Sequence, residues 1–189
     1  MGSSVRHAEA LLPAIAEVLE AAYLRPDDLE GVVVGAGPGS FTGVRVAAAT
    51  ARGLARSLEI PLFAYGSLLA LAAAAGRTDR AVCALMDARR GEVYAACYAN
   101  GGGAYRTLLE PLAAPLPEVL AAVAPHRPVF AGSTVPGLPD GTERAVGAMS
   151  PAAALIRLGA QDPEGGLVPV PARWEPAYLR PPGAVRVIW

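Results

Sequence analysis

The first part of the chain reads as a helix followed by a buried strand. Over residues 3–23, Leu11, Ile15 and Leu19 recur at helical spacing, which predicts one apolar stripe on a helix. Residues 31–36 form a short β-branched run without polar alternation, as expected for a strand that is buried on both faces.

A second pair of the same kind follows. Residues 42–57 predict a helix rich in alanine, residues 60–65 predict another strand, and Ser67 is placed to cap a third helix. This alternation of strands and helices favours an α/β protein with a parallel sheet covered by helices.

The pattern changes after residue 80. Two apolar runs, 81–88 and 92–99, are joined by a short Arg-Arg-Gly link, which predicts a β-hairpin, and a third strand follows the glycine turn at 100–103. The remainder predicts a helix, a strand and a helix capped by Ser150, and then a proline-rich strap from Gln161.

The front of this arrangement looks incomplete. The first helix has an apolar stripe but no preceding strand to cover, and the strand at 31–36 would lie at or near a sheet edge, which is a liability for a folded protein. We expect strands that precede the first helix to be missing from the N-terminal part of this chain.

Composition narrows the functional classes. With 53% hydrophobic and 17% charged residues among 189, the chain is globular. A net charge of -1 carries no basic excess for nucleic acid, and no apolar window predicts a membrane span. The cysteines, Cys83 and Cys97, lie in apolar runs without CxxC spacing, which favours a reducing cytoplasm.

A glycine-rich loop joins the first strand to the second helix, where many proteins bind phosphate. It lacks the Gly-Lys-Ser/Thr of a P-loop and the glycine spacing of a dinucleotide fingerprint, and Pro38 stands where a nucleophile elbow needs glycine. Two readings stay open, a tight capped turn or an anion site. The candidate anion-binding residues are Gly37, Gly39, Ser40, Thr42 and Gly43.

The alanine-rich helix has small apolar residues around most of its circumference, so it is buried on more than one side. The second side is either internal or the surface of another subunit, because small side chains let a second helix approach closely. The residues predicted for a partner interface are Val44, Ala47, Ala48, Ala51 and Leu54.

Other chemistry is sparse. The charged hairpin tip with Asp87, Arg89, Arg90 and Glu92 is interpreted as structural, with Asp87 and Arg90 placed to clamp the turn. Only two histidines are present, and neither has metal-ligand spacing, so we expect no metal, no cofactor and no catalytic residue.

Four segments together resemble one family. They are HAEALLPAI (residues 7–15), GPGSFTGVR (37–45), DARRGEVY (87–94) and EPAYLR (175–180), and they occur in the order of the TsaB family, also called YeaZ. The resemblance implies an actin/hexokinase/Hsp70-like, ribonuclease H-like fold of two lobes. We predict the remnant of the N-terminal lobe at residues 1–66 and the C-terminal lobe at 67–189.

The resemblance also implies a function. Proteins of this family are non-catalytic scaffold subunits that pair with a catalytic paralogue, TsaD, and work with the ATPase TsaE. Together they modify the adenosine beside the anticodon of certain tRNAs with threonylcarbamoyl. A homodimer is an alternative pairing, and tRNA would be reached only through the complex.

This chain departs from the family in one respect, because the N-terminal strands with their Asp-Thr-Ser-like phosphate motif are absent from it. An autonomous kinase-like enzyme on the same fold is therefore disfavoured. A peptidase is disfavoured because the sequence shows neither a nucleophile–base pair nor a metal triad. We expect the glycine-rich loop mainly to set the start of an interface helix.

Overall fold

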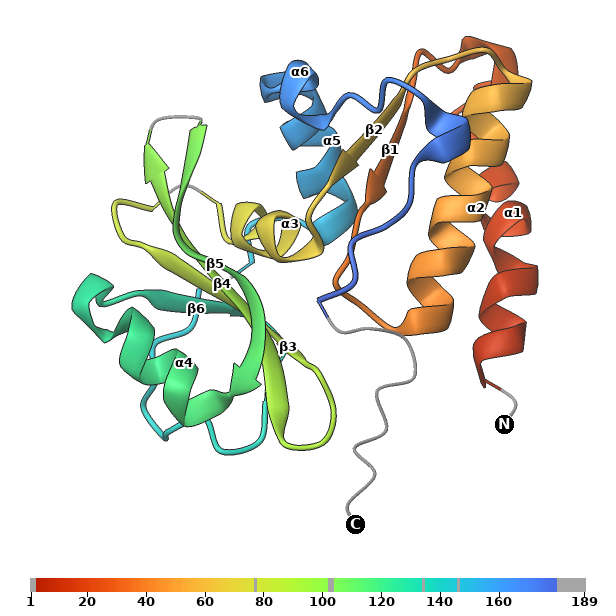
Figure 1. Cartoon of the computed structure of the whole chain (residues 1–189). Helices are drawn as coiled ribbons and strands as arrows, with labels where there is room; N and C mark the ends of the chain where they lie inside the picture. The colour runs from red at the N-terminus through yellow and green to blue at the C-terminus, as the bar shows by residue number, and fades with distance from the viewer. Residues whose placement is uncertain (1–2, 77, 102–103, 134, 146, 180–189) are drawn as a thin grey trace.

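The computed structural model describes residues 3–76, 78–101, 104–133, 135–145 and 147–179, and it contains two sheets (Figure 1). The last segment of the sequence, residues 180–189, with the end of the EPAYLR motif and Trp189, lies outside the described residues.

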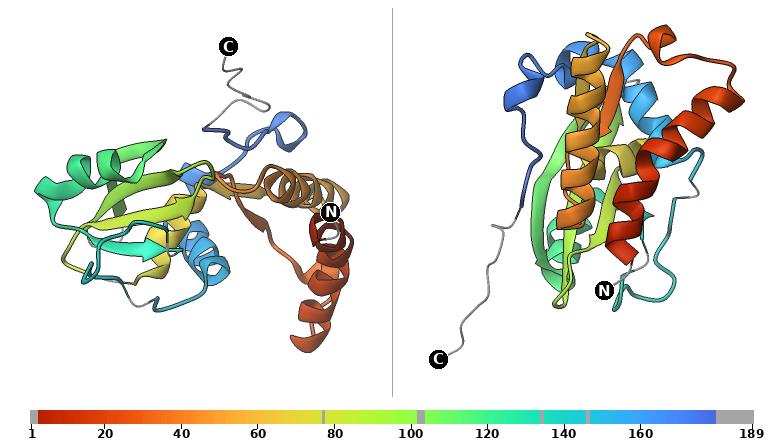
Figure 2. Two further views of the ribbon diagram at one scale, coloured as in Figure 1. Left: turned by 90° about the horizontal axis from the view of Figure 1, so that it is seen from below. Right: turned by 90° about the vertical axis from the view of Figure 1, so that its right-hand side faces the viewer.

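The first sheet confirms the predicted parallel unit. Strands β1 and β2 run parallel with Val32 opposite Leu62, and within the described residues β1 pairs only with β2. Helix α2 packs on one face of this sheet, and α1 packs on α2 (Figure 2). The elements of this region are α1 (Ser3–Ala21), η1 (Pro26–Asp28), β1 (Val32–Gly35), α2 (Phe41–Ser57) and β2 (Leu62–Tyr65).

The second sheet has the strand order β5-β4-β3-β6, and the predicted hairpin between β3 and β4 is confirmed. Strand β6 runs parallel to β3 at the other edge. The strands are β3 (Val82–Asp87), β4 (Glu92–Gly101), β5 (Ala104–Pro115) and β6 (Val129–Gly132). Strand β5 is longer than its sequence pattern predicts, because it continues pairing with β4 as far as Pro115.

Alternation along β3 divides the second core into two layers. Cys83 and Leu85 face α4, whereas Val82 and Ala84 face α3, as the period of two in a strand requires. The helices are α3 (Ser67–Ala74) and α4 (Leu116–Val123), which is followed by η2 (Ala124–His126). The predicted cap at Ser67 is wrong: Gly66 is the N-cap, and the N–H of Ser67 donates to the carbonyl of Gly37 at 2.7 Å.

The end of the described chain returns to the first sheet. Helix α5 is capped by Ser150, as predicted, and packs Ala154 and Leu158 among apolar residues of the first sheet and α3. The returning elements are α5 (Pro151–Gln161), α6 (Pro163–Gly166) and η3 (Pro171–Arg173). The division at residue 66 stays a prediction. The structure adds that α6 and η3 contact β2 and α2 of the first lobe, whereas α5 packs on α3 as well as on β1 and β2. No helix in the described ranges has the length and apolarity to cross a membrane.

The two cysteine thiols are buried opposite each other on β3 and β4. Burial, followed by the neighbouring thiol of Cys97, raises the pKa of Cys83 from 9.0 to about 12. Burial likewise raises the pKa of Cys97 to about 11. Both raised pKa values make the neutral thiols part of the folded state.

We predict that the protein loses stability in alkali for this reason. Unfolding exposes thiols that ionise near their ordinary pKa, so the free energy of unfolding should fall as pH rises above about 9 and remain unaffected by the thiols below it. Urea midpoints measured between about pH 8 and 10.5 test this. The variant Cys83→Ala should show a shallower fall, and an equal fall in both proteins would contradict the assignment.

Candidate functional site

The glycine-rich loop turns the chain from β1 into α2 against its own C-terminal segment. Gly37 has φ +91°, and a Cβ at this position would lie 2.6 Å from the carbonyl oxygen of Ala177. The space beside this glycine is therefore occupied by a backbone oxygen, whose partial negative charge is unfavourable for an anion.

The other residues of the loop also have internal partners. Ser40 is the N-cap of α2, and its hydroxyl accepts the N–H of Gly43 at 3.1 Å, while Thr42 lies in the first turn and is exposed. A Cβ on Gly39 would lie 2.8 Å from a methyl group of Val44. Of the two readings, the geometry favours the capped turn, and an anion site at this loop stays a prediction.

The strap, defined here as residues 167–179, holds the loop and α2 together from outside (Figure 1). The N–H of Ala177 donates to the carbonyl of Ala36 at 2.8 Å, and the N–H of Val168 donates to that of Leu62 at 2.9 Å. Arg52 of α2 donates to the carbonyl of Ala172 at 2.5 Å. The predicted strap is confirmed from residue 167 onward, apart from the short helix η3, whereas residues 163–166 form α6 instead.

An exposed aromatic and cationic group marks the start of α2. The guanidinium of Arg45 lies 4.1 Å from the ring centre of Phe41, and its Nε donates to the hydroxyl of Tyr178 at 3.2 Å. The two rings are 5.8 Å apart and remain 45% and 36% exposed. Sequence reasoning missed this group, because residues 133 positions apart form it.

The structure corrects part of the predicted interface on α2. Ala48 and Ala51 are each only 4% exposed, so they pack inside the lobe and do not point outward. Ala47 packs beside the buried cluster of Val34, Ala51 and Leu62. Internal packing thus accounts for these alanines.

Other residues of α2 do face outward. Ala49 is exposed, and a Cβ on Gly53 would meet no atom within 4 Å. Val44 is half-buried over the glycine loop, whereas Leu54 reaches the groove between α1 and α2. Ala49 and Gly53 are four residues apart and lie on a different side of the helix from the buried alanines. This spacing was the signal in the sequence that could have identified the outward face.

An apolar groove of about 360 Å³ runs between α1 and α2. Leu12 and Leu24 line this groove and are 55% and 46% exposed. Val18 of α1, which is not part of the lining, is 68% exposed. The groove is lined by Leu12, Ile15, Ala16, Leu19, Glu20, Leu24, Pro26, Leu29, Leu54 and Leu58. Large exposed apolar side chains gathered along one groove are typical of a protein-binding surface.

The hairpin tip at residues 87–92 is organised by backbone contacts. The carboxylate of Asp87 accepts the N–H of Arg89 at 2.7 Å, and the carbonyl of Arg89 accepts the N–H of Glu92 at 3.2 Å. Arg89 and Arg90 have φ values of 65° and 58°. Asp87 thus compensates a turn in which two arginines adopt left-handed conformations, which supports the structural interpretation.

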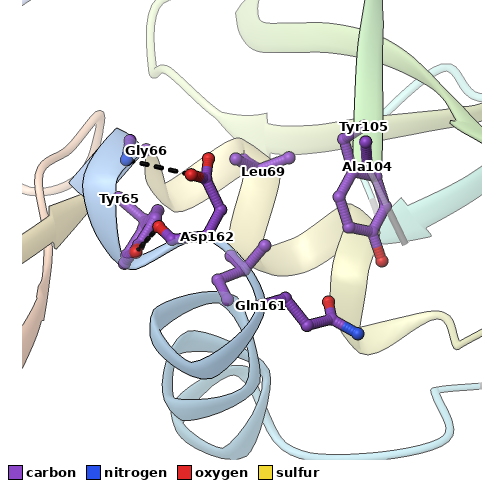
Figure 3. A pocket seen from close by; sticks show the side chains of 9 residues that line it. Tyr65, Gly66, Leu69, Ala104, Tyr105, Gln161 and Asp162 are labelled. Carbon is purple, nitrogen blue, oxygen red and sulfur yellow. Dashed lines mark hydrogen bonds between the residues drawn. The ribbon is translucent and has the colours of Figure 1, made fainter.

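A larger cavity, of about 800 Å³, lies where α3, α6 and the start of β5 meet (Figure 3). Its polar groups mainly bond to each other. The hydroxyl of Tyr65 donates to the carbonyl of Asp162 at 2.5 Å, and the carboxylate of Asp162 accepts the N–H of Gly165 at 2.9 Å. Its lining contains a single carboxylate and no histidine or cysteine, so it presents no pair of a nucleophile and a base.

The predicted absence of a metal site stays a prediction. Among the residues that the structure describes, no three histidine, cysteine or carboxylate side chains lie close enough together to bind a metal ion. His126 ends η2 in the second lobe, far along the chain from the glycine loop.

We predict opposite effects for two alanine substitutions of glycine. Gly37→Ala should lower the free energy of unfolding by about 2 kcal/mol, because it forces a side chain into a left-handed position against the strap. Gly53→Ala should raise it by about 0.5–1 kcal/mol, because this helical position is open. Urea unfolding measures both, and equal effects would show that the strap does not press on Gly37.

We also predict a small effect at the hairpin. Asp87→Ala should lower the free energy of unfolding by about 1 kcal/mol or less, because the lost hydrogen bond is exposed. Partner binding by the purified variant, measured by pull-down, should equal that of the native chain. Loss of partner binding in a folded variant would make the tip functional.

Comparisons with known proteins agree with the fold. The family model described as "TsaD: tRNA N6-adenosine threonylcarbamoyltransferase" matches residues 2–132. The structure of YeaZ from Pseudomonas aeruginosa superposes with a TM-score of 0.77 at 30% identity, covering 92% of this chain and 84% of that one.

Two curated relatives share about two fifths of their length with this chain. Both are named tRNA threonylcarbamoyladenosine biosynthesis protein TsaB. The Bacillus subtilis protein is 41% identical over 97 residues, which is 51% of this chain and 42% of its own length. The Escherichia coli protein is 39% identical over 94 residues, which is 49% of this chain and 41% of its own length.

The predicted actin/hexokinase/Hsp70-like fold is confirmed by the match to YeaZ and by the mixed sheets, and the chain belongs to the TsaB (YeaZ) family.

Proposed function

We propose that this chain is a non-catalytic subunit in the biosynthesis of threonylcarbamoyladenosine in tRNA, and that it binds a TsaD-type catalytic paralogue. The names of its relatives support the pathway. The observation that carries the proposed role is the apolar groove between α1 and α2, in which Leu12 and Ala16 remain exposed.

The groove fits a helical partner. Its walls are mainly leucine and isoleucine side chains from α1, α2 and the segment that follows α1, and the small side chain of Ala16 is exposed among them. Ridges of a partner helix can enter such a groove, and small residues allow the two backbones to approach closely. A related subunit of the same fold would bring comparable helices, so the proposed contact is a bundle of helices from both subunits.

Two features support a role without chemistry of its own. In the cavity of about 800 Å³, Tyr65 and Asp162 have hydrogen-bond partners within the lining, and the Ala177 carbonyl of the strap lies beside Gly37 of the glycine-rich loop. Neither arrangement offers an activated nucleophile or a group that polarises a phosphate. The proposal therefore assigns catalysis to the paralogue and ATP hydrolysis to a TsaE-type subunit, and it assigns the same helical face to a second copy of this chain when the paralogue is absent.

The exposed residues of the groove provide the test. Leu12→Glu and Ala16→Glu should each weaken capture of a TsaD-type paralogue at least tenfold, because a charge is placed in the apolar groove and is buried there without a partner. Circular dichroism should show folded variants, since both positions are exposed. Pull-down and light scattering measure partner capture and self-association.

Two further alanine variants provide the controls. Ala121→Glu, on the exposed side of α4 in the other lobe, should bind the paralogue as the native chain does. Ala51→Glu, at a position only 4% exposed, should unfold the protein instead of blocking one surface. If Leu12→Glu and Ala16→Glu remain folded and bind with native affinity, the α1–α2 groove is not the interface.

A further inference from the structure

A row of arginines follows the side of α2 that faces the strap. Arg52 and Arg56 follow Arg45 by seven and eleven residues, which are close to two and three full helical turns. The three arginines therefore lie on one line about 16 Å long. Arg173 is exposed in η3, a segment of the strap that contacts α2. We call these four residues the arginine stripe.

The arginine stripe lies apart from the proposed partner surface. The strap and α1 pack on opposite sides of α2, as the right-hand view of Figure 2 shows. Arg52 and Arg56 line a second groove, of about 370 Å³, between α2 and residues 169–172. The face for a helical partner and the arginine stripe are therefore two different surfaces of one helix.

Local charge along the stripe differs from the charge of the whole chain. Helix α2 contains no acidic residue, and only Glu59 just beyond its end and Glu175 on the strap lie nearby in the sequence. The stripe thus concentrates positive charge in a protein of net charge -1. Arg52 is also held in place by bonds to the carbonyls of Ala172 and Trp174, which leave its charge intact.

Exposed aromatic rings stand at one end of the stripe. Phe41 and Tyr178 flank Arg45 and remain 45% and 36% exposed. Arginines that contact phosphates, next to aromatic rings on which unpaired bases stack, are the combination used to bind single-stranded or looped RNA.

We propose that the arginine stripe, with Phe41 and Tyr178, binds the backbone and an unstacked base of RNA, so that this subunit contacts tRNA directly. The identification of the RNA as tRNA rests on the proposed function. The evidence for an RNA-binding surface is independent of that function. The proposal revises the expectation, implied by the family resemblance, that tRNA is reached only through the complex. The net charge of -1 also gave no sign of this local concentration of arginines.

The test measures binding of the full chain to an unmodified transcript of a tRNA that reads codons beginning with A, by fluorescence polarisation at several salt concentrations. Arg56→Glu and Arg173→Glu should each weaken binding about fivefold or more and lower the slope of log affinity against log salt by about one. Phe41→Ala should weaken binding of the tRNA about fivefold or more but leave binding of a fully paired RNA duplex unchanged.

Two matched variants control for charge and for loss of an aromatic ring. Arg106→Glu changes the net charge equally on an exposed position of β5, and Tyr23→Ala removes a side chain that is 96% exposed beyond the end of α1. Both should bind tRNA as the native chain does. Equal weakening by Arg56→Glu, Arg173→Glu and Arg106→Glu, or no binding by the native chain at low salt, overturns the proposal.

Capture of the TsaD-type paralogue by the same variants separates this proposal from the proposed function. Arg56→Glu should lose tRNA and retain the paralogue, whereas Ala16→Glu in the groove should do the reverse. Loss of the paralogue by Arg56→Glu would assign the stripe to a protein interface and overturn RNA binding there. Failure of Ala16→Glu to affect capture would overturn the helical interface and leave the RNA result standing.

Discussion

The first lobe depends on the return of residues 151–179 to a sheet of only two strands. A pair of strands is marginal in water without further cover. Here α2 covers one face, α5 covers the other, and the strap closes the outside with backbone hydrogen bonds from Val168 to Leu62 and from Ala177 to Ala36. The lobe is thus held together by segments more than 100 residues apart in the sequence.

The same return decides what the glycine-rich loop does. A loop between a strand and a helix offers backbone N–H groups to an anion only if the space in front of it is open. In this fold the Ala177 carbonyl lies beside Gly37, and the hydroxyl of Ser40 caps α2 by accepting the N–H of Gly43. Gly37 is needed because the backbone of the strap lies too close to it for a side chain. The motif, which also occurs at phosphate sites, thus has a structural use here.

Helix α2 has three distinct sides. Ala48, Ala51 and Ala55 are buried against the sheet, Leu54 and Leu58 line the groove shared with α1, and the arginines face the strap. The side that remains open carries Ala49 and Gly53. One helix thus contributes to the core and to two separate candidate binding surfaces, which is why a description by composition alone could not assign its alanines.

The sequence by itself determined the order and type of the elements, the parallel first sheet, the β3–β4 hairpin, the Ser150 cap and the family, because these follow from local periodicity, turn residues and short motifs. It did not determine which side of α2 is outward, since Ala48 and Ala49 are chemically identical and differ only in what packs on them. It also could not bring Tyr178 to Arg45 or Ala177 to Gly37. Those contacts join distant segments, and only the tertiary structure, in which the strap returns to the first lobe, decided them.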